Sequence, residues 1–265
     1  PQIRLTNVVN PNWNWYVMLY QPNAAQQGTW NASGDDFARS NIPQVAAELT
    51  WLTDRCGHIG KDRLYLAISG MVGREKVKYA SPTSPGRWSD DGVNAWATAL
   101  KGFIPIVPER KGNKSMSLFL KGQFLYGQNW RVFNTANADS AAYNQDLSAG
   151  TSYVAPTAFA WYAQVGFYLT GRLWANLYYS DMKNNLSYRY LWNVGNSSAI
   201  RTFRQWSANL MFDVNPAIRA GLQFSHIDTG YAGYGTSNAD PCITTGVLGR
   251  SGALNTVRFA AWYFF

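Results

Sequence analysis

The residues that decide the fold close the sequence: Leu254-Asn255-Thr256-Val257-Arg258-Phe259-Ala260-Ala261-Trp262-Tyr263-Phe264-Phe265. Every second residue from Val257 to Phe265 is apolar. The other face carries Thr256, Arg258, Ala260, Trp262 and Phe264. This period of two predicts a β-strand whose two faces meet different surroundings.

The same period of two recurs upstream in segments of about ten residues, which is the length that a tilted strand needs to cross a bilayer. In one of them, for example, Phe159, Trp161, Ala163 and Val165 alternate with residues such as Tyr162 and Gln164. We expect eleven strands, at about residues 2–9, 13–20, 43–53, 62–73, 93–105, 115–126, 156–169, 172–180, 201–213, 217–228 and 254–265.

The composition separates this pattern from that of a soluble sheet. Charged residues make up 14% of the chain and aromatic residues 15%, whereas soluble proteins have about 25% charged residues. The polar faces carry Gln, Asn, Ser and Tyr more than Lys and Glu, as expected for a wet lumen. No stretch approaches the roughly 18 apolar residues of a transmembrane helix, so a membrane-spanning form would have to be a closed sheet.

The connections between the expected strands alternate between short and long. Residues 10–12, 170–172 and 214–216 are tight turns rich in Asn, Pro and Gly, and 54–61 and 107–114 are somewhat longer. The polar stretches 21–42, 74–92, 128–155, 181–200 and 229–253 lie between them. Outer-membrane barrels have short periplasmic turns and long extracellular loops. The sequence therefore predicts an all-β fold: one transmembrane antiparallel β-barrel domain over residues 1–265, in the outer membrane of a Gram-negative bacterium.

The expected number of strands is odd, whereas bacterial single-chain barrels have an even number. The first expected strand runs into a short turn, and so would enter from outside the cell. We therefore expect an odd number of strands before Pro1, in a barrel of sixteen strands, with twelve possible. The alternative is that residues 1–9 form a periplasmic tail or plug segment.

Several segments resemble known proteins. Tyr263-Phe264-Phe265 looks like the terminal signal of outer-membrane proteins. Residues 1–6, 14–22, 42–49 and 215–226 resemble strands and turns of the DcaP-like porins. The resemblance implies a sixteen-stranded, trimeric porin, and some members of that family favour anionic organic solutes.

Charged residues at alternating positions are the candidate functional residues. The cationic candidates expected to face the lumen are Arg63, Lys121, Arg172, Arg219 and Arg258, with Arg201 at an extracellular strand end and Glu48 as the main acidic counterpart. A charge on the lipid face costs about 2–4 kcal/mol near the midplane, which favours the inward assignment. A cationic lumen would lower the barrier for small anionic solutes. Alternatively, these cations pair with acids on preceding strands or on an inserted loop.

Enzymatic and metal chemistry find little support. His58 is expected in a periplasmic turn and His226 near an extracellular strand end, so they cannot form one site. Cys56 and Cys242 are expected on opposite sides of the membrane and fit neither a disulfide nor a metal-ligand spacing. We expect no catalytic residues, no metal and no cofactor.

The formal charge of +8 fits either an ordinary solvated surface or an affinity for anionic solutes and lipopolysaccharide phosphates. The basic residues are scattered, which argues against nucleic acid. Trp13, Trp15, Tyr20, Trp51, Trp161, Tyr179, Trp206 and Tyr263 are expected in interfacial aromatic girdles. The leading interpretation is a passive porin in contact with outer-membrane lipid. The alternative is a barrel that serves as scaffold or sheath for a partner such as an electron-transfer cytochrome.

Overall fold

The computed structural model describes residues 2–20, 43–80, 88–128, 157–185, 200–231 and 251–264. These residues form one sheet of eleven strands. The strands are β1 (Gln2–Asn10), β2 (Trp13–Tyr20), β3 (Gln44–Ile59), β4 (Asp62–Ala80), β5 (Trp88–Val107), β6 (Leu118–Gln128), β7 (Thr157–Tyr168), β8 (Leu173–Asn185), β9 (Ile200–Asn215), β10 (Ile218–Tyr231) and β11 (Ser251–Tyr263). No helix long and apolar enough to cross a membrane occurs in this part of the chain.

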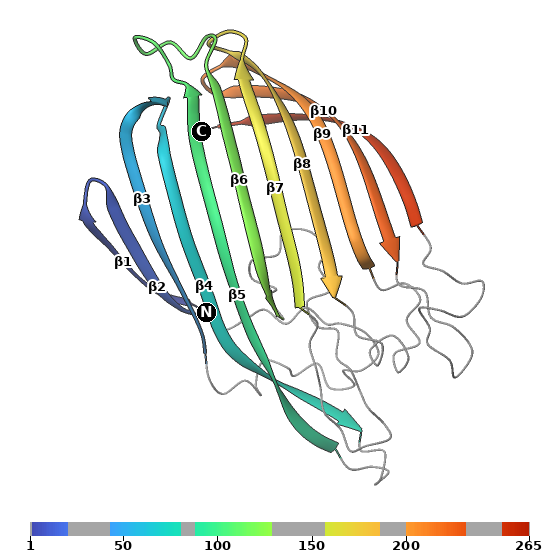
Figure 1. The fold of residues 1–265 in the computed structure, drawn as a ribbon. Coiled ribbons are helices and arrows are strands. Elements are labelled where there is room, and N and C mark those ends of the chain that lie inside the picture. The colour runs from blue at the N-terminus through green and yellow to red at the C-terminus, as the bar shows by residue number, and fades with distance from the viewer. Residues whose placement is uncertain are drawn as a thin grey trace.

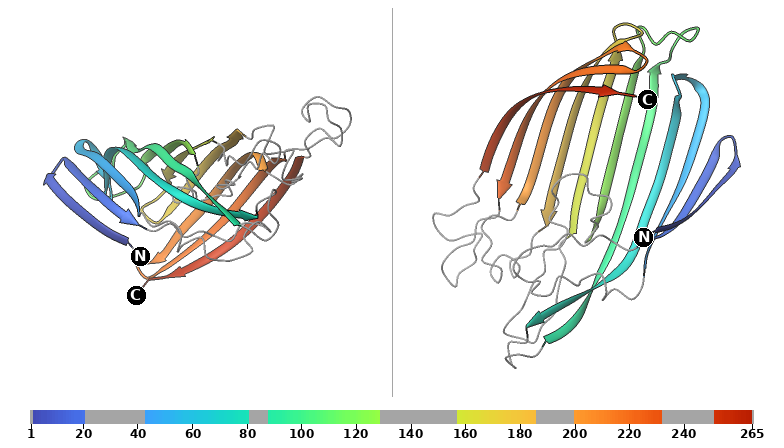
Figure 2. Two further views of the ribbon diagram at one scale, coloured as in Figure 1. Left: turned by 90° about the horizontal axis from the view of Figure 1, so that it is seen from below. Right: turned by 180° about the vertical axis from the view of Figure 1, so that it is seen from behind.

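The strands follow one another across the sheet in chain order, and each described strand pairs antiparallel with its neighbours. The sheet is strongly curved, and in Figure 2 it is seen as an open trough with β1 and β11 at its two edges. It is not closed, since β1 pairs with β2 and β11 with β10. The short turns lie at the end of the sheet where the chain finishes (Figure 1). We call this the short-turn end.

All eleven predicted strands are confirmed, but several boundaries differ. β4 continues to Ala80 and β5 begins at Trp88, so most of the expected loop 74–92 is a paired ribbon. Its register continues as far as Ala80 and Trp88. The sequence of this ribbon is charged and has no regular apolar alternation, so the pattern of period two did not predict its pairing. β6 begins later than expected, since Met116 has a φ of 64° and Ser117 N–H bonds Lys114 O at 3.0 Å.

The three predicted tight turns are confirmed, and they share one hydrogen-bonding arrangement. A side-chain oxygen at the first turn position accepts two backbone N–H groups that follow it. Asn10 Oδ1 accepts from Asn12 and Trp13. Thr170 Oγ1 accepts from Arg172 and Leu173. Asn215 Oδ1 accepts from Ala217 and Ile218 at 2.8 and 2.9 Å.

The convex face of the sheet is apolar and open. Leu177, Leu222 and Phe259 are 64%, 52% and 74% exposed, and each projects from the same face of its strand. A contiguous apolar surface that spans several strands is unusual in a soluble monomer. It is typical of a surface that faces lipid or a partner.

The concave face carries the buried residues. One apolar cluster runs across β2 to β9 and is made mainly of small or flexible side chains, among them Ala46, Met71, Ala97, Leu125 and Met182. Small residues suit this face because side chains converge on the inner side of a curved sheet. The sheet thus presents an apolar outer surface and a mixed polar inner one.

Candidate functional site: the concave wall

The strand register decides which predicted charges share the concave wall. Glu48 is the cross-strand partner of Tyr16 and Ser69, and Lys121 that of Phe103 and Gln164. Following the pairs across the sheet places Glu48, Arg63, Lys121, Arg219 and Arg258 on the concave side.

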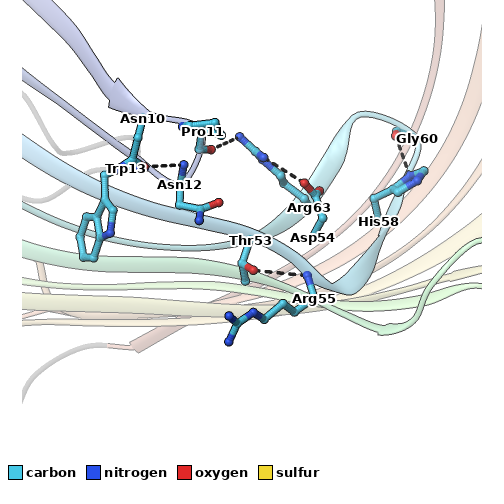
Figure 3. A network of polar contacts seen from close by, with 10 residues as sticks. All are labelled: Asn10, Pro11, Asn12, Trp13, Thr53, Asp54, Arg55, His58, Gly60 and Arg63. Carbon is cyan, nitrogen blue, oxygen red and sulfur yellow. Dashed lines mark hydrogen bonds and ion pairs between the residues drawn. The ribbon is translucent and has the colours of Figure 1, made fainter.

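Arg63 lies at the short-turn end and holds two turns together. Its guanidinium donates to Asp54 Oδ2 at 3.1 Å and to Pro11 O at 2.8 Å, as Figure 3 shows. The register of β3 slips between Thr53 and His58, and this bulge brings Asp54 beside Arg63. Arg63 therefore has an acidic partner on the same hairpin.

Arg219 is also paired. Its Nε and Nη2 donate to the two oxygens of Asp213 at 2.6 and 3.3 Å. The guanidinium also lies 4.6 Å from the centroid of the Trp174 ring and 5.5 Å from that of Phe264. This arrangement joins β8, β9 and β10 to the final aromatic residues, so Arg219 has a structural role near the end of the chain.

Glu48 forms the centre of a polar cluster that the sequence pattern did not reveal. Lys101 Nζ lies 2.7 Å from Glu48 Oε2, and Tyr16 and Thr50 donate to the same carboxylate at 3.3 and 3.1 Å. Lys101 was not among the predicted lumen residues. The sequence signal that could have identified Lys101 is its position between Leu100 and Gly102 in an alternating segment. The register places Leu100 on the convex face and Lys101 on the concave face.

Four predicted cations make no ion pair with any described residue: Lys121, Arg172, Arg201 and Arg258. Lys121 is half-buried in the middle of the wall, between β5 and β7. Arg258 is exposed on the edge strand β11, opposite Gln223. Arg201 is exposed near the far end of β9, and Arg172 is exposed in the turn before β8. The structure thus separates the predicted set into paired and unpaired charges.

Neutral polar side chains form a ladder beside these charges. Gln164 Nε2 donates to Asn176 Oδ1 at 3.1 Å, and Asn176 Nδ2 donates to Asn209 Oδ1 at 2.6 Å. One row further, the hydroxyls of Ser207 and Ser225 lie 2.8 Å apart. The ladder crosses β7 to β10 and gives this part of the wall hydrogen-bonding groups without net charge.

The short-turn end of the concave wall is lined by packed rings. Phe103 and Phe119 have centroids 5.3 Å apart, Ile59 packs against them, and the cluster continues to Tyr168. Ile59 reaches this position because the β3–β4 turn is tied to the segment after β5. Glu109 N–H donates to His58 O at 2.9 Å, and the nearly buried Glu109 carboxylate accepts from Gly60 N–H at 2.6 Å.

The aromatic girdle needs one correction. Trp13, Trp51, Tyr179, Trp206 and Tyr263 project from the convex face, as predicted. Tyr20, in contrast, lies on the concave face, is 6% exposed, and donates to Gln44 Oε1 at 2.8 Å. Its neighbour Leu19 occupies the outward position. The prediction used nearness to a strand end and overlooked the parity of the residue.

His58 and His226 lie toward opposite ends of the sheet, at the short-turn end of β3 and near the far end of β10. Among the described residues, no group of three His, Cys, Asp or Glu side chains is arranged to hold a metal ion. Cys56 is exposed and free, and Cys242 lies outside the described residues.

An antiparallel sheet with an exposed apolar convex face and a polar concave face is the architecture of a porin-like β-barrel wall. The fold matches the outer membrane channel DcaP of Acinetobacter baumannii with a TM-score of 0.67 at 15% identity, over 100% of this chain and 62% of that one. The DcaP-like fold implied by the sequence resemblance is thereby confirmed, and the chain spans 62% of the length of the channel it matches. The NanC porin aligns with a TM-score of 0.40 at 11% identity, over 100% of this chain and 92% of that one. No protein-family model and no curated sequence matches the chain.

Proposed function

We propose that this sheet forms the wall of a porin, a passive diffusion channel for small hydrophilic solutes in the outer membrane of a Gram-negative bacterium. The observation that carries the proposal is the division of one continuous sheet into two faces. Leu177, Leu222 and Phe259 are exposed on the convex face, whereas the concave face has the amide ladder and most of the charges. A sheet with lipid on one side and water on the other has this distribution.

In this proposal the short-turn end lies in the periplasm and the opposite end faces outward, as short turns and long loops are distributed in outer-membrane barrels. The rows of Leu and Phe contact lipid acyl chains, and the end of the sheet opposite the short turns faces lipopolysaccharide. Assembly as a homotrimer, which the family resemblance implies, belongs to the same proposal.

An anion preference follows from the pairing pattern on the concave wall. Glu48, Asp54 and Asp213 are each paired with a cation on this wall, Lys101, Arg63 and Arg219 respectively. Lys121, Arg201 and Arg258 keep an uncompensated charge among the described residues. A wall with these charges raises the local concentration of anions and lowers that of cations.

The test is the reversal potential across a planar bilayer that separates two concentrations of potassium chloride. We expect the sign that corresponds to chloride permeating faster than potassium. Replacing Lys121 by Gln should lower the permeability ratio roughly two- to five-fold, because a unit charge a few Å from a hydrated ion is worth about 0.5–1 kcal/mol in water. A protein that forms no channel would disprove the function, and a cation-selective channel would disprove the anion preference.

A further inference from the structure

Five polar side chains form a continuous patch in the middle of the concave wall. They are Lys121 and Gln123 on β6, Tyr162 and Gln164 on β7, and Tyr178 on β8, and we call them the Lys121 patch. Lys121 is paired in register with Gln164, Gln123 with Tyr162, and Gln164 with Tyr178. Directly opposed residues have Cβ atoms about 4.5–5.5 Å apart, so the five side chains are immediate neighbours. All five are half-buried.

The patch differs from the rest of the wall because its hydrogen-bonding groups are largely unused. Neither Lys121 nor Gln123 makes a side-chain hydrogen bond to a described residue, and the same holds for the hydroxyls of Tyr162 and Tyr178. Gln164 donates through Nε2 to Asn176, which leaves its Oε1 as an acceptor. The neighbouring ladder, by contrast, satisfies itself through Asn176 and Asn209.

The two tyrosine rings add a second surface. Tyr162 and Tyr178 have centroids 5.5 Å apart with planes inclined by 32°. Because both rings stay partly exposed on the concave face, they offer aromatic surface next to the ammonium group of Lys121 and the carboxamide of Gln164. The aromatic rings can pack against the C–H groups of a solute, and the phenol oxygens can form hydrogen bonds with its hydroxyls.

The charge of the patch is a single positive charge. Lys121 makes no ion pair with a described residue. The next cation along the wall is Lys101, whose cross-strand partner is Gln123. Lys101 is committed to Glu48 at 2.7 Å, so a second anionic group of a solute would meet a neutralised pair. The patch thus complements one carboxylate, and its amides and phenols complement hydroxyl groups.

We propose that the Lys121 patch binds a polyhydroxylated monocarboxylate, that is, a sugar acid, during its passage through the channel. Lys121 holds the carboxylate, Gln123 and Gln164 bond the hydroxyls, and the rings of Tyr162 and Tyr178 contact the carbon chain. This inference rests on the proposed porin function and narrows its anionic solutes to one chemical class.

The experiment measures the block of chloride current in single channels by three added solutes. Gluconate is the sugar acid, glutarate is a dicarboxylate without hydroxyls, and sorbitol has the hydroxyls without charge. We expect gluconate to block at a lower concentration than either of the other two. Lys121→Gln should weaken the gluconate block about five-fold, which corresponds to one unit charge at contact distance in water. Lys121→Arg should retain most of it.

Two further variants make the test specific. Lys183→Gln removes a cation from the exposed convex side of β8 and should leave the block unchanged. Glu48→Gln frees Lys101 and should improve the glutarate block relative to gluconate, because a second unpaired ammonium then lies beside the patch.

The outcomes distinguish the two levels of the proposal. A channel that favours chloride but is blocked equally by gluconate and glutarate overturns the sugar-acid site and leaves the porin function intact. The same conclusion follows if Lys121→Gln and Lys183→Gln behave alike. A protein without any channel activity overturns the porin function and the site together.

Discussion

Arg219 shows how a charged residue on the concave wall can stabilise the fold. Its guanidinium is held by Asp213 and covered by the rings of Trp174 and Phe264. Arg219→Gln should lower the free energy of unfolding by about 1–2 kcal/mol, the sum of a partly exposed ion pair and a cation–π contact. The temperature at which the folded band disappears in a heat-modifiability gel measures this effect.

The matched control for this residue is Arg201→Gln. Arg201 is exposed and makes no ion pair with a described residue. Its replacement should leave the unfolding temperature unchanged. If the unfolding temperature fell equally in the two variants, the contacts of Arg219 with Asp213, Trp174 and Phe264 would not stabilise the fold.

At the same scale, sequence reasoning could place a residue on a face but could not find its partner. Alternation assigned Lys121 and Arg219 to the inner face from their neighbours alone. That Arg219 meets Asp213 depends on the register of β9 against β10, and that Lys101 meets Glu48 depends on the order of three strands. Such pairs are set by tertiary register, which a local pattern of period two does not contain.

At the scale of elements, two turns at the short-turn end behave as one unit. Gly60 has a φ of 62°, which an L-residue with a side chain adopts at a cost, and its N–H is held by the Glu109 carboxylate. Glu109→Ala should free the β3–β4 turn and remove a hydrogen bond to a charged group, worth about 1.5–3 kcal/mol. Faster amide hydrogen exchange at residues 58–61 measures the loss.

The conservative variant Glu109→Gln is the control for that prediction. Its side-chain oxygen can still accept from Gly60, so exchange should rise less than in Glu109→Ala. Unchanged protection in the alanine variant would contradict the assigned role of Glu109 and would attribute the order of this turn to the packing of Ile59 against Phe103.

The elements themselves were largely predictable, and the exceptions have one physical origin. In the proposed barrel the outer face is apolar within the bilayer, so each crossing segment has a regular alternation. Outside the bilayer the same strand needs only backbone pairing, and its sequence can be as polar as a loop. The ends of β4 and β5 at Ala80 and Trp88 therefore escaped the pattern, although their backbones remain paired.

At the scale of the molecule, the proposed porin function requires that adjacent residues of one strand face lipid and water in turn. Leu222 projects outward and is 52% exposed, whereas Gln223 lies on the concave face and donates to Ser225. In a background with Cys56 and Cys242 replaced by Ser, Gln223→Cys should react with a small hydrophilic maleimide in native membranes. Leu222→Cys should stay unlabelled because lipid covers it. Equal labelling at the two positions would contradict a membrane-embedded wall.

The orientation of the whole sheet can be tested with a native residue. Cys56 is exposed at the short-turn end of β3, which the proposed topology places in the periplasm. With Cys242 replaced by Ser, a bulky impermeant maleimide should leave intact cells unlabelled and label Cys56 once the outer membrane is permeabilised. Labelling in intact cells would show that the sheet has the opposite orientation, with its short turns outside the cell. The concave wall and its Lys121 patch would then face the same lumen, but solutes would enter from the end lined by Phe103 and Phe119.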